Sequence, residues 1–511
     1  MFQSDGFLAD IRPLPLEAPA APHDSDLGAL QSKRRHNAAA LVSTLPNELL
    51  GAIFLHGWEG KNGQHDQTFG AVTTQVCSLW RDVAVNEPLL WTHIQFVNTS
   101  CPLDDTRRSS IDWIIAHLER SKGAQLCIQV TLYRHDTAHT KLFAETIRPH
   151  LHRCVRLDIT DHVFVAPHYI LPLDERLCGL RELNVSVAKS GESLPVTSNE
   201  PDLVLALPDT TFNSLLSVSV RSIGVFVSLR DMAAPNLKVF VADIYRGVTL
   251  YRDFVIFCAS CKKLQRLKLK HTGIRLGIPR TSVQLPNLQL LDLSGGMPYQ
   301  LFFGVSPSVK HLITSSELPP FSDEGWGLLE LGLERRYPFP YLRTARIDIT
   351  NFEPPDVRRH KMADFLTNQQ FLTAVELFST RFSAEILRAF TSEPYLPARL
   401  DEDEPGDIVT SLTSATLLPC PDLNLLHLNV ILVDGMGLEG TVEALEDSLE
   451  RILSDRRELT IVWSMWYNFM PKWMVQLTER LSSFNGRFKW RPKHEPNPMA
   501  AFVTFSDELV E

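Results

Sequence analysis

The stretch Pro286-Asn287-Leu288-Gln289-Leu290-Leu291-Asp292-Leu293 decides the fold. It contains the pattern Leu-x-x-Leu-x-Leu, whose alternating leucines are typical of a buried β-strand. The pattern recurs loosely along the chain, and three of its copies follow a Pro-Asn-Leu or Pro-Asp-Leu tripeptide. The copies begin at Leu180, Leu215, Leu237, Leu264, Leu288, Val309, Leu342, Leu372 and Leu423.

The spacing of these copies indicates a repeat array. Between Leu215 and Val309 they begin 21 to 27 residues apart, in or near the range of leucine-rich repeats, whereas other gaps reach 51 residues. The array is therefore irregular and carries insertions, including an acidic one near residues 395–410. A closed or doubly wound parallel sheet is the alternative, because any buried strand is rich in Leu, Val and Ile. The repeated spacing and the lack of glycine-rich phosphate loops favour a solenoid.

Helical and strand patterns alternate on both sides of these copies, which predicts an α/β fold with a largely parallel sheet. In the first part of the chain we expect a helix at Ser109–Ser121, a strand at Leu126–Leu132, a helix at Lys141–His150 and a strand at Val155–Ile159. At the end we expect helices at Val442–Arg456 and Lys472–Phe484 and strands at Leu459–Trp463 and Ala501–Phe505.

Composition and charge narrow the class of protein. The chain has 511 residues, 44% hydrophobic and 22% charged, which is ordinary for a globular protein. A net charge of −10 does not favour nucleic acid as a partner. Met1–Asp24 lacks the features of a signal peptide, and no apolar run is long enough to span a membrane. The eight scattered cysteines suit reduced thiols in the cytoplasm or the nucleus, or in both.

Motifs that carry chemistry are weak or absent. Cys258-Ala259-Ser260-Cys261 is a lone CxxC pair at the end of an apolar segment, so buried thiols are expected rather than a metal or redox site. His135 and His139 lack the carboxylate of a zinc protease. Because there is also no nucleophile elbow, Walker loop or dinucleotide fingerprint, the sequence predicts no catalytic residue, no metal ligand, no cofactor and no enzyme activity.

A second informative segment precedes the repeats. It opens with Leu45-Pro46-Asn47-Glu48-Leu49-Leu50-Gly51-Ala52-Ile53-Phe54, which predicts a short helix with apolar residues around most of its circumference. It closes with Val76-Cys77-Ser78-Leu79-Trp80-Arg81-Asp82-Val83-Ala84 and Pro88-Leu89-Leu90-Trp91. The closing part predicts a second helix that contains Val76, Leu79, Trp80 and Val83. A helix that is apolar on several sides needs cover on several sides, so a partner is one option and a small self-contained core the other.

These three pieces, in this order, resemble the F-box, and especially the F-box-like proteins of basidiomycete fungi. The resemblance covers about fifty residues. In that family a short apolar helix lies in the middle of the motif, whereas here the polar segment Trp58–Phe69 predicts a loop. The repeats are similar to the irregular leucine-rich repeats that follow the F-box in many such proteins.

The resemblance implies a division of the chain and a docking site. Residues 1–38 form a loosely ordered leader, residues 39–100 an F-box-like helical module, and residues 101–511 a leucine-rich-repeat solenoid shaped like a horseshoe. The module docks on a Skp-type adaptor and through it on a cullin. The adaptor-binding residues implied are Leu45, Pro46, Leu49, Leu50, Ile53, Phe54, Val76, Trp80 and Trp91.

The repeats offer a candidate surface for a protein substrate. Residues that alternate with the core leucines point to the opposite face of the sheet, and in a solenoid they form one concave surface. The candidate residues are Arg266, Lys268, Lys270, Asp292, Arg346, Asp348 and His427. For any single one of these residues, a solvent-exposed position that binds no ligand is an equally good explanation. The sequence thus predicts a non-catalytic substrate receptor of a Skp–cullin–F-box ubiquitin ligase, and the alternative is a repeat-based scaffold with no ligase attached.

Overall fold

The computed structural model describes two compact units, Met1–Gly224 (unit 1) and Val225–Glu511 (unit 2). The described residues are Gly28, Ser32, 41–59, 69–98, 110–133, 137–162, 177–188, 204–206, 212–223, 226–228, 233–245, 248–270, 273–275, 285–293, 308–314, 339–348, Arg359, 362–363, 365–379, 382–391, 419–430, 438–439, 442–465 and 472–492. The predicted acidic insertion, the predicted strand Ala501–Phe505, most of the leader and most of the predicted loop Trp58–Phe69 lie outside these residues.

Unit 1 begins with helices and continues with strands and helices in alternation. Its elements are η1 (Leu41–Thr44), α2 (Asn47–Trp58), α3 (Phe69–Val76), α4 (Ser78–Asn86), η2 (Pro88–Trp91), β1 (His93–Asn98), α5 (Ile111–Arg120), β2 (Leu126–Leu132), α6 (Thr137–Ile147), η4 (Arg148–Arg153), β3 (Cys154–Asp161), β4 (Glu182–Ala188), β5 (Val204–Ala206) and β6 (Ser217–Ile223).

Unit 2 is richer in strands. Its elements are β7 (Phe226–Ser228), β8 (Val239–Tyr245), β9 (Val248–Leu250), α7 (Tyr251–Ser260), β10 (Arg266–Lys270), β11 (Gly273–Arg275), β12 (Leu290–Leu293), β13 (His311–Thr314), β14 (Thr344–Asp348), β15 (Ala374–Ser379), β16 (Phe382–Ser383), α9 (Ala384–Leu387), η9 (Arg388–Phe390), β17 (Leu425–Val430), β18 (Leu438–Glu439), α10 (Val442–Asp455), β19 (Thr460–Met465), α11 (Lys472–Arg480), η10 (Leu481–Phe484) and β20 (Phe488–Pro492).

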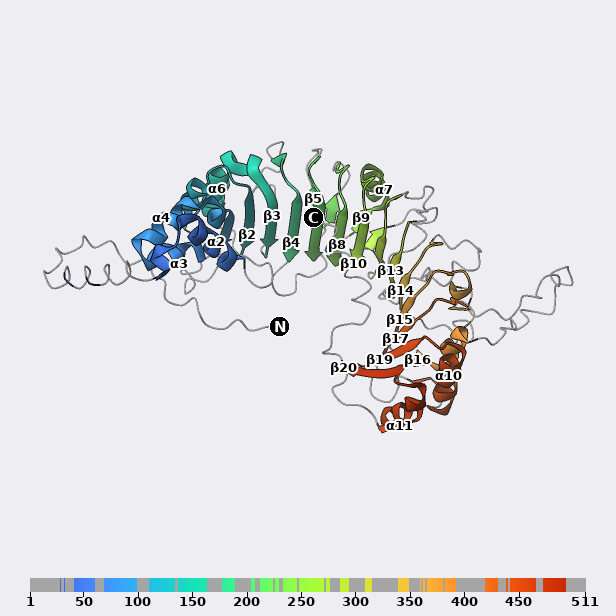
Figure 1. The fold of residues 1–511 in the computed structure, drawn as a ribbon. Coiled ribbons are helices and arrows are strands. Elements are labelled where there is room, and N and C mark those ends of the chain that lie inside the picture. The colour runs from blue at the N-terminus through green and yellow to red at the C-terminus, as the bar shows by residue number, and fades with distance from the viewer. Residues whose placement is uncertain are drawn as a thin grey trace. The chain divides into compact units, whose positions relative to one another are not determined.

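The main strands of each unit pair in chain order. In unit 1 the order is β1-β2-β3-β4-β6, and in unit 2 it is β8-β10-β12-β13-β14-β15-β17-β19-β20. Each of these neighbouring pairs is parallel within its unit, as the arrows of β2, β3 and β4 in Figure 1 show. The predicted α/β fold with a largely parallel sheet is therefore confirmed.

The repeated apolar positions form continuous buried rows across the strands. In unit 1 one row runs through Ile128, Leu157, Leu183 and Val218, which pair in register and are buried. In unit 2 the corresponding row is longer and equally buried. It consists of Phe240, Leu267, Leu291, Leu312, Ala345, Val375, Leu426 and Ile461. The second leucine of the pattern thus faces the core in each copy of this row.

A tight turn leads into many of these strands and explains the Pro-Asn-Leu tripeptide. The amide of Leu288 donates to the carbonyl of Leu285 over 3.1 Å, which closes a four-residue turn with Pro286 in its second position. Proline suits that position because its fixed φ matches the turn. Equivalent bonds join Leu237 to Ala234 and Leu423 to Cys420, each over 3.1 Å.

Two buried arginines tie neighbouring turns together. In unit 1 the Arg153 guanidinium donates to the carbonyls of Lys122, Ala124 and Leu118. In unit 2 the Arg456 guanidinium donates to the carbonyls of Phe390, Cys420 and Pro419. Each side chain therefore satisfies three carbonyl groups that are at least 29 residues away in the chain.

The helical segment at the start of unit 1 has its own core. Leu50, Phe54 and Trp58 of α2 pack with Val83 and Ala84 of α4 and with Leu90 and Trp91 of η2. Gly57 lies against the Phe69 ring, so that a Cβ at this position would be 2.6 Å from it. This contact holds α2 and α3 together.

The structure differs from the sequence prediction in a few elements. Val76 ends α3, because Cys77 takes an extended backbone and caps α4, so Val76 does not belong to the closing helix. Helix α2 begins at Asn47, so Leu45 and Pro46, which open the predicted helical stretch, precede the helix. Strands β1 and β20 were not predicted. Both pair in parallel with a neighbouring strand, β1 with β2 and β20 with β19.

His117 makes the stability of unit 1 depend on pH. Its ring lies between the indoles of Trp91 and Trp113, with centroids 5.0 and 4.5 Å away. Burial, and then the positive charge of Arg120, lower the pKa of His117 from 6.5 to about 4. The unfolded chain therefore binds a proton that the folded chain rejects between these two values. We expect the free energy of unfolding to fall by on the order of 2–3 kcal/mol as pH decreases from 6.5 to 4, and to level off below.

Urea unfolding at a series of pH values checks this prediction. His117→Phe keeps a ring in place and removes the titration, so its stability should depend less on pH than that of the natural protein. His311 and His427, whose pKa values burial also lowers to about 4, contribute equally to both proteins. Identical pH profiles would show that His117 is not the group responsible.

Candidate interaction surfaces

Helix α2 presents apolar residues to both sides. Leu50, Phe54 and Trp58 point into the core, whereas Leu49 and Ile53, four residues apart, are 52% and 50% exposed. The exposed pair forms a stripe along the helix, because residues four apart lie on one face. A helix that exposes such a stripe commonly contacts another protein.

Helix α3 repeats this arrangement. Val72 and Val76 are also four residues apart and are each 51% exposed. Among the described residues, six of the fourteen exposed large apolar side chains lie between Val42 and Leu89. Exposed apolar surface is therefore concentrated in the helical segment rather than spread evenly over the protein.

The structure divides the nine predicted adaptor residues into three groups. Leu50, Phe54 and Trp91 are buried in the helical core, and there they can support a docking surface but not touch a partner. Leu45 and Trp80 are half-buried, and the Trp80 ring packs on Phe54 with centroids 5.0 Å apart. The remaining four are exposed, and these are Pro46, Leu49, Ile53 and Val76.

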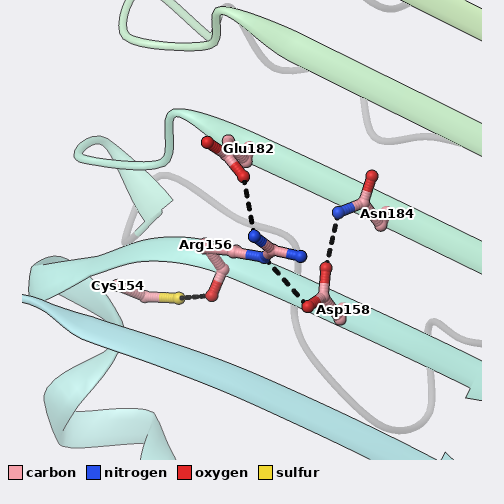
Figure 2. Close-up of polar contacts among 5 residues, drawn as sticks. All are labelled: Cys154, Arg156, Asp158, Glu182 and Asn184. Carbon is pink, nitrogen blue, oxygen red and sulfur yellow. Dashed lines mark hydrogen bonds and ion pairs between the residues drawn. The ribbon is translucent and has the colours of Figure 1, made fainter. Parts of the chain in front are cut away.

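The outward side chains of unit 1 form a polar network on β3 and β4 (Figure 2). The Arg156 guanidinium lies 3.0 Å from Asp158 Oδ2 and 3.4 Å from Glu182 Oε2, while the Asn184 amide donates to Asp158. The one cation faces two carboxylates, so this network is acidic. The Cys154 thiol donates to the Arg156 carbonyl over 3.3 Å. Burial raises the pKa of Cys154 to about 12, so the thiol stays protonated and unreactive near neutral pH.

Unit 2 pairs buried carboxylates with cations on neighbouring strands. Asp292 is buried, and its Oδ2 lies 3.1 Å from Lys268 Nζ. Glu376 is also buried, and its Oε1 lies 3.7 Å from Arg346 Nε. In both cases the partners are register neighbours on adjacent parallel strands. These carboxylates hold the two cations in place on the outward face.

His427 extends the second of these pairs. Its Nδ1 lies 3.6 Å from Glu376 Oε1, and its Nε2 lies 2.8 Å from Ser464 Oγ. Burial lowers the pKa of His427 to about 4, although the charge of Glu376 acts in the opposite direction. An imidazole with so low a pKa is a poor general base at neutral pH, and its side chain is covered. The serine, histidine and glutamate therefore form one covered polar network on the outward face.

No protein-family model matches this chain, and no curated protein matches it. Among the described helices, none combines the length and apolarity that crossing a membrane requires. No group of three or more His, Cys, Asp or Glu side chains in the described part of the chain is arranged to hold a metal ion.

Of the seven predicted substrate residues, the five whose side chains the structure describes lie on one strand face. Lys268, Asp292, Arg346 and His427 lie on the outward face of unit 2, together with half-buried Arg266. The side chains of Lys270 and Asp348 lie outside the described part. Sequence reasoning missed Glu376, the partner of both Arg346 and His427. It stands between two core residues, Val375 and Leu377, and the alternation that pointed to Asp292 would have found it.

Proposed function

We propose that this protein is a non-catalytic substrate receptor of a Skp–cullin–F-box ubiquitin ligase. The helical segment docks on the adaptor, and the repeats, a leucine-rich-repeat solenoid, hold a protein substrate. Tethering raises the effective concentration of substrate lysines near the ubiquitin carrier. The receptor itself forms no covalent intermediate.

The exposed apolar stripes of α2 and α3 carry this proposal. Leu49, Ile53, Val72 and Val76 give a helical surface of the kind that binds another protein, in the segment whose residues resemble the F-box. The presence of α3 also supports the resemblance, because it supplies a short helix in the middle of the motif. The core under the stripes is closed by Trp91, so the surface rests on a packed support.

The leucine-rich-repeat assignment has separate support. Main strands follow one another in chain order within each unit, as in a solenoid. Their core positions recur every 21 to 27 residues between Phe240 and Leu312, and every 30 to 51 residues from there to Ile461. The recurring turn before the strand gives the repeats a common entry.

A binding titration with a purified Skp-type adaptor tests the docking surface. Leu49→Ala/Ile53→Ala removes exposed side chains, so we expect the adaptor affinity to fall about tenfold or more, with thermal stability almost unchanged. The matched control is Ile115→Ala/Leu142→Ala, which truncates two exposed apolar residues of α5 and α6. This control should bind the adaptor as the natural protein does.

Two results would refute the docking proposal. One is the absence of adaptor binding by the natural protein at tens of micromolar, an affinity of about −6 kcal/mol. The other is an equal loss of affinity in the α2 variant and the control variant.

A scaffold without a ligase is the second candidate, and one observation favours it. The helical segment continues directly into β1, which pairs with β2, and Arg120 of α5 lies 4.4 Å above the Trp91 ring. The segment is thus packed onto the first strand, as a cap that closes a repeat array would be. Stable partners that co-purify without adaptor or cullin would support this candidate.

A further inference from the structure

In the described residues of the turns that lead into six consecutive strands of unit 2, β8 to β15, every charged side chain is positive. In their described residues (233–238, 261–265, 285–289, 308–310, 339–343 and 369–373) there are five lysines and arginines and no aspartate or glutamate. The chain as a whole has a net charge of −10, so the charge of these turns is opposite in sign to that of the whole chain. We call these turns the cationic edge; its charged residues are Lys238, Lys262, Lys263, Lys310 and Arg343.

The cations of this edge are held in a fixed row. The amide of Lys310 donates to the Gln289 carbonyl, and the amide of Arg343 donates to the Lys310 carbonyl, each over 2.8 Å. Lys310 and Arg343 therefore occupy adjacent strands, whose backbones are about 4.8 Å apart. Side chains add further links between turns, since Asn287 donates to the Lys262 carbonyl and Thr373 to the Arg343 carbonyl.

Like charges placed side by side repel each other unless an anion neutralises them. Among the described residues, none forms an ion pair with Lys262, Lys263, Lys310 or Arg343. The Asp292 and Glu376 carboxylates on the outward face are engaged with Lys268 and Arg346 instead. No carboxylate of the described residues therefore neutralises these four cations, and their fixed backbone positions favour a negatively charged ligand.

The behaviour of His311 agrees with this positive field. Its Nδ1 lies 2.9 Å from Thr344 Oγ1, at the start of β13. Burial, and then the charges of Lys310, Arg343 and Arg266, lower its pKa to about 4. Three positive charges thus lower the pKa of His311 together, whereas the negative charge of Glu376 acts to raise the pKa of His427 on the outward face.

An exposed aromatic pair borders the cations. Tyr341 and Phe371 stand in the turns before β14 and β15, with ring centroids 5.7 Å apart, and are 54% and 49% exposed. Tyr341 is two residues from Arg343. Aromatic rings next to cations suit a ligand with both an apolar group and negative charges.

We propose that the cationic edge of unit 2 binds an extended acidic peptide, with an apolar side chain against Tyr341 and Phe371. The four strand spacings from β10 to β15 amount to about 19 Å, which about six extended residues cover. A short peptide fits better than a nucleic acid, because the net charge of −10 repels a long polyanion beyond the edge. This inference names the substrate class of the proposed receptor, and in that sense rests on the proposed function.

Fluorescence anisotropy of labelled peptides against the full chain tests the proposal. The probe is a peptide of about eight residues with alternating glutamates and one phenylalanine. A second peptide carries phosphoserine in place of two glutamates, and a third carries glutamine at each glutamate. We expect the first two to bind, more weakly as salt is added, and the glutamine peptide to bind about tenfold less well or not at all. Whichever of the first two peptides binds more tightly shows whether carboxylates or phosphates supply the negative charge of the ligand.

Charge reversal locates the site. Lys263→Glu/Lys310→Glu/Arg343→Glu should weaken the acidic peptide about tenfold or more, and the milder Lys310→Gln/Arg343→Gln should weaken it less, with both folded by circular dichroism. The matched control Arg457→Glu/Lys472→Glu changes two exposed cations elsewhere in unit 2 and should have little effect.

Several outcomes would overturn the proposal. One is that neither acidic peptide binds. Another is that the charge-reversed and natural proteins bind the acidic peptides equally well. A third is that a single-stranded oligonucleotide binds more tightly than the peptides do. The adaptor titration is a separate measurement. Peptide binding without adaptor binding would support the cationic edge as a binding site and refute the ligase proposal. Adaptor binding without peptide binding would support the ligase proposal and refute the peptide site.

Discussion

Trp91→Ala should lower the free energy of unfolding of the helical segment by about 3–5 kcal/mol, the usual cost of removing a buried tryptophan. The indole is fully buried, and its Nε1 donates to the Ala84 carbonyl over 2.7 Å. Arg120 covers one part of the ring, and a Cβ added at Gly70 would lie 3.6 Å from another. Alanine would leave a cavity and remove one of the two hydrogen bonds that the Ala84 carbonyl accepts, the other coming from the Glu87 amide over 3.3 Å, so the losses add.

Amide hydrogen exchange on the full chain measures this effect locally. Protection should fall in residues 69–98 and remain in strands β10 to β15, because repeats contact mainly their neighbours. Trp91→Phe retains a ring and should cost less. Trp113→Ala, which removes an exposed tryptophan of α5, is the matched control and should have a small effect. Protection of residues 69–98 that survives Trp91→Ala would contradict the prediction.

Arg456→Ala should have an effect of similar size in unit 2. The buried guanidinium donates to the Phe390 carbonyl over 3.0 Å and to the Cys420 carbonyl over 2.7 Å, and it also reaches Pro419. The Cys420 carbonyl keeps the Leu423 amide as a donor, whereas the Phe390 and Pro419 carbonyls lose the guanidinium. Each buried carbonyl left without a donor costs about 1–3 kcal/mol, so the total expected loss is on the order of 2–5 kcal/mol. Arg456→Lys should recover only part of it, because an ammonium cannot reproduce the planar fork of donors.

Urea unfolding monitored by exchange of β17 and β19 checks this second prediction. The matched control is Arg457→Ala, which truncates the exposed arginine next in the chain and should change stability by about 0.5 kcal/mol or less. Equal losses for the two variants would mean that the carbonyl contacts of Arg456 do not stabilise the turn.

The sequence predicted the parallel strands well because their signal is local. The Leu-x-x-Leu-x-Leu spacing identified each position of the core row from Phe240 to Leu426 separately. The last position, Ile461, lies in the predicted strand Leu459–Trp463. Strand β2 was predicted with the bounds that the structure has. Strand β1 was missed although Ile94 and Phe96 alternate in it, because residues 39–100 were predicted to form a helical module. Strand β20 is short and includes two cations and a proline, which weaken a strand pattern.

The surfaces were predicted less completely, because burial is a property of the whole fold. No pattern in α2 distinguishes Leu49 from Leu50, yet one is half exposed and the other fully buried. Likewise, no local signal links Arg456 to carbonyls at Phe390 and Cys420, since only folding brings the turns together. The sequence does not predict the cationic edge, because its residues are spread from Lys238 to Arg343 and come into line only when the strands pair.

The pairing of each main strand with its nearest predecessor also bears on synthesis at the ribosome. Within each unit, a newly emerged strand finds its partner already made, because the order of the strands is the order of the chain. Folding can therefore proceed from the first strands onward while translation continues, at about 5–20 residues per second. A repeat of 21 to 27 residues would join the growing sheet every few seconds, so little unpaired apolar strand would wait for a distant partner.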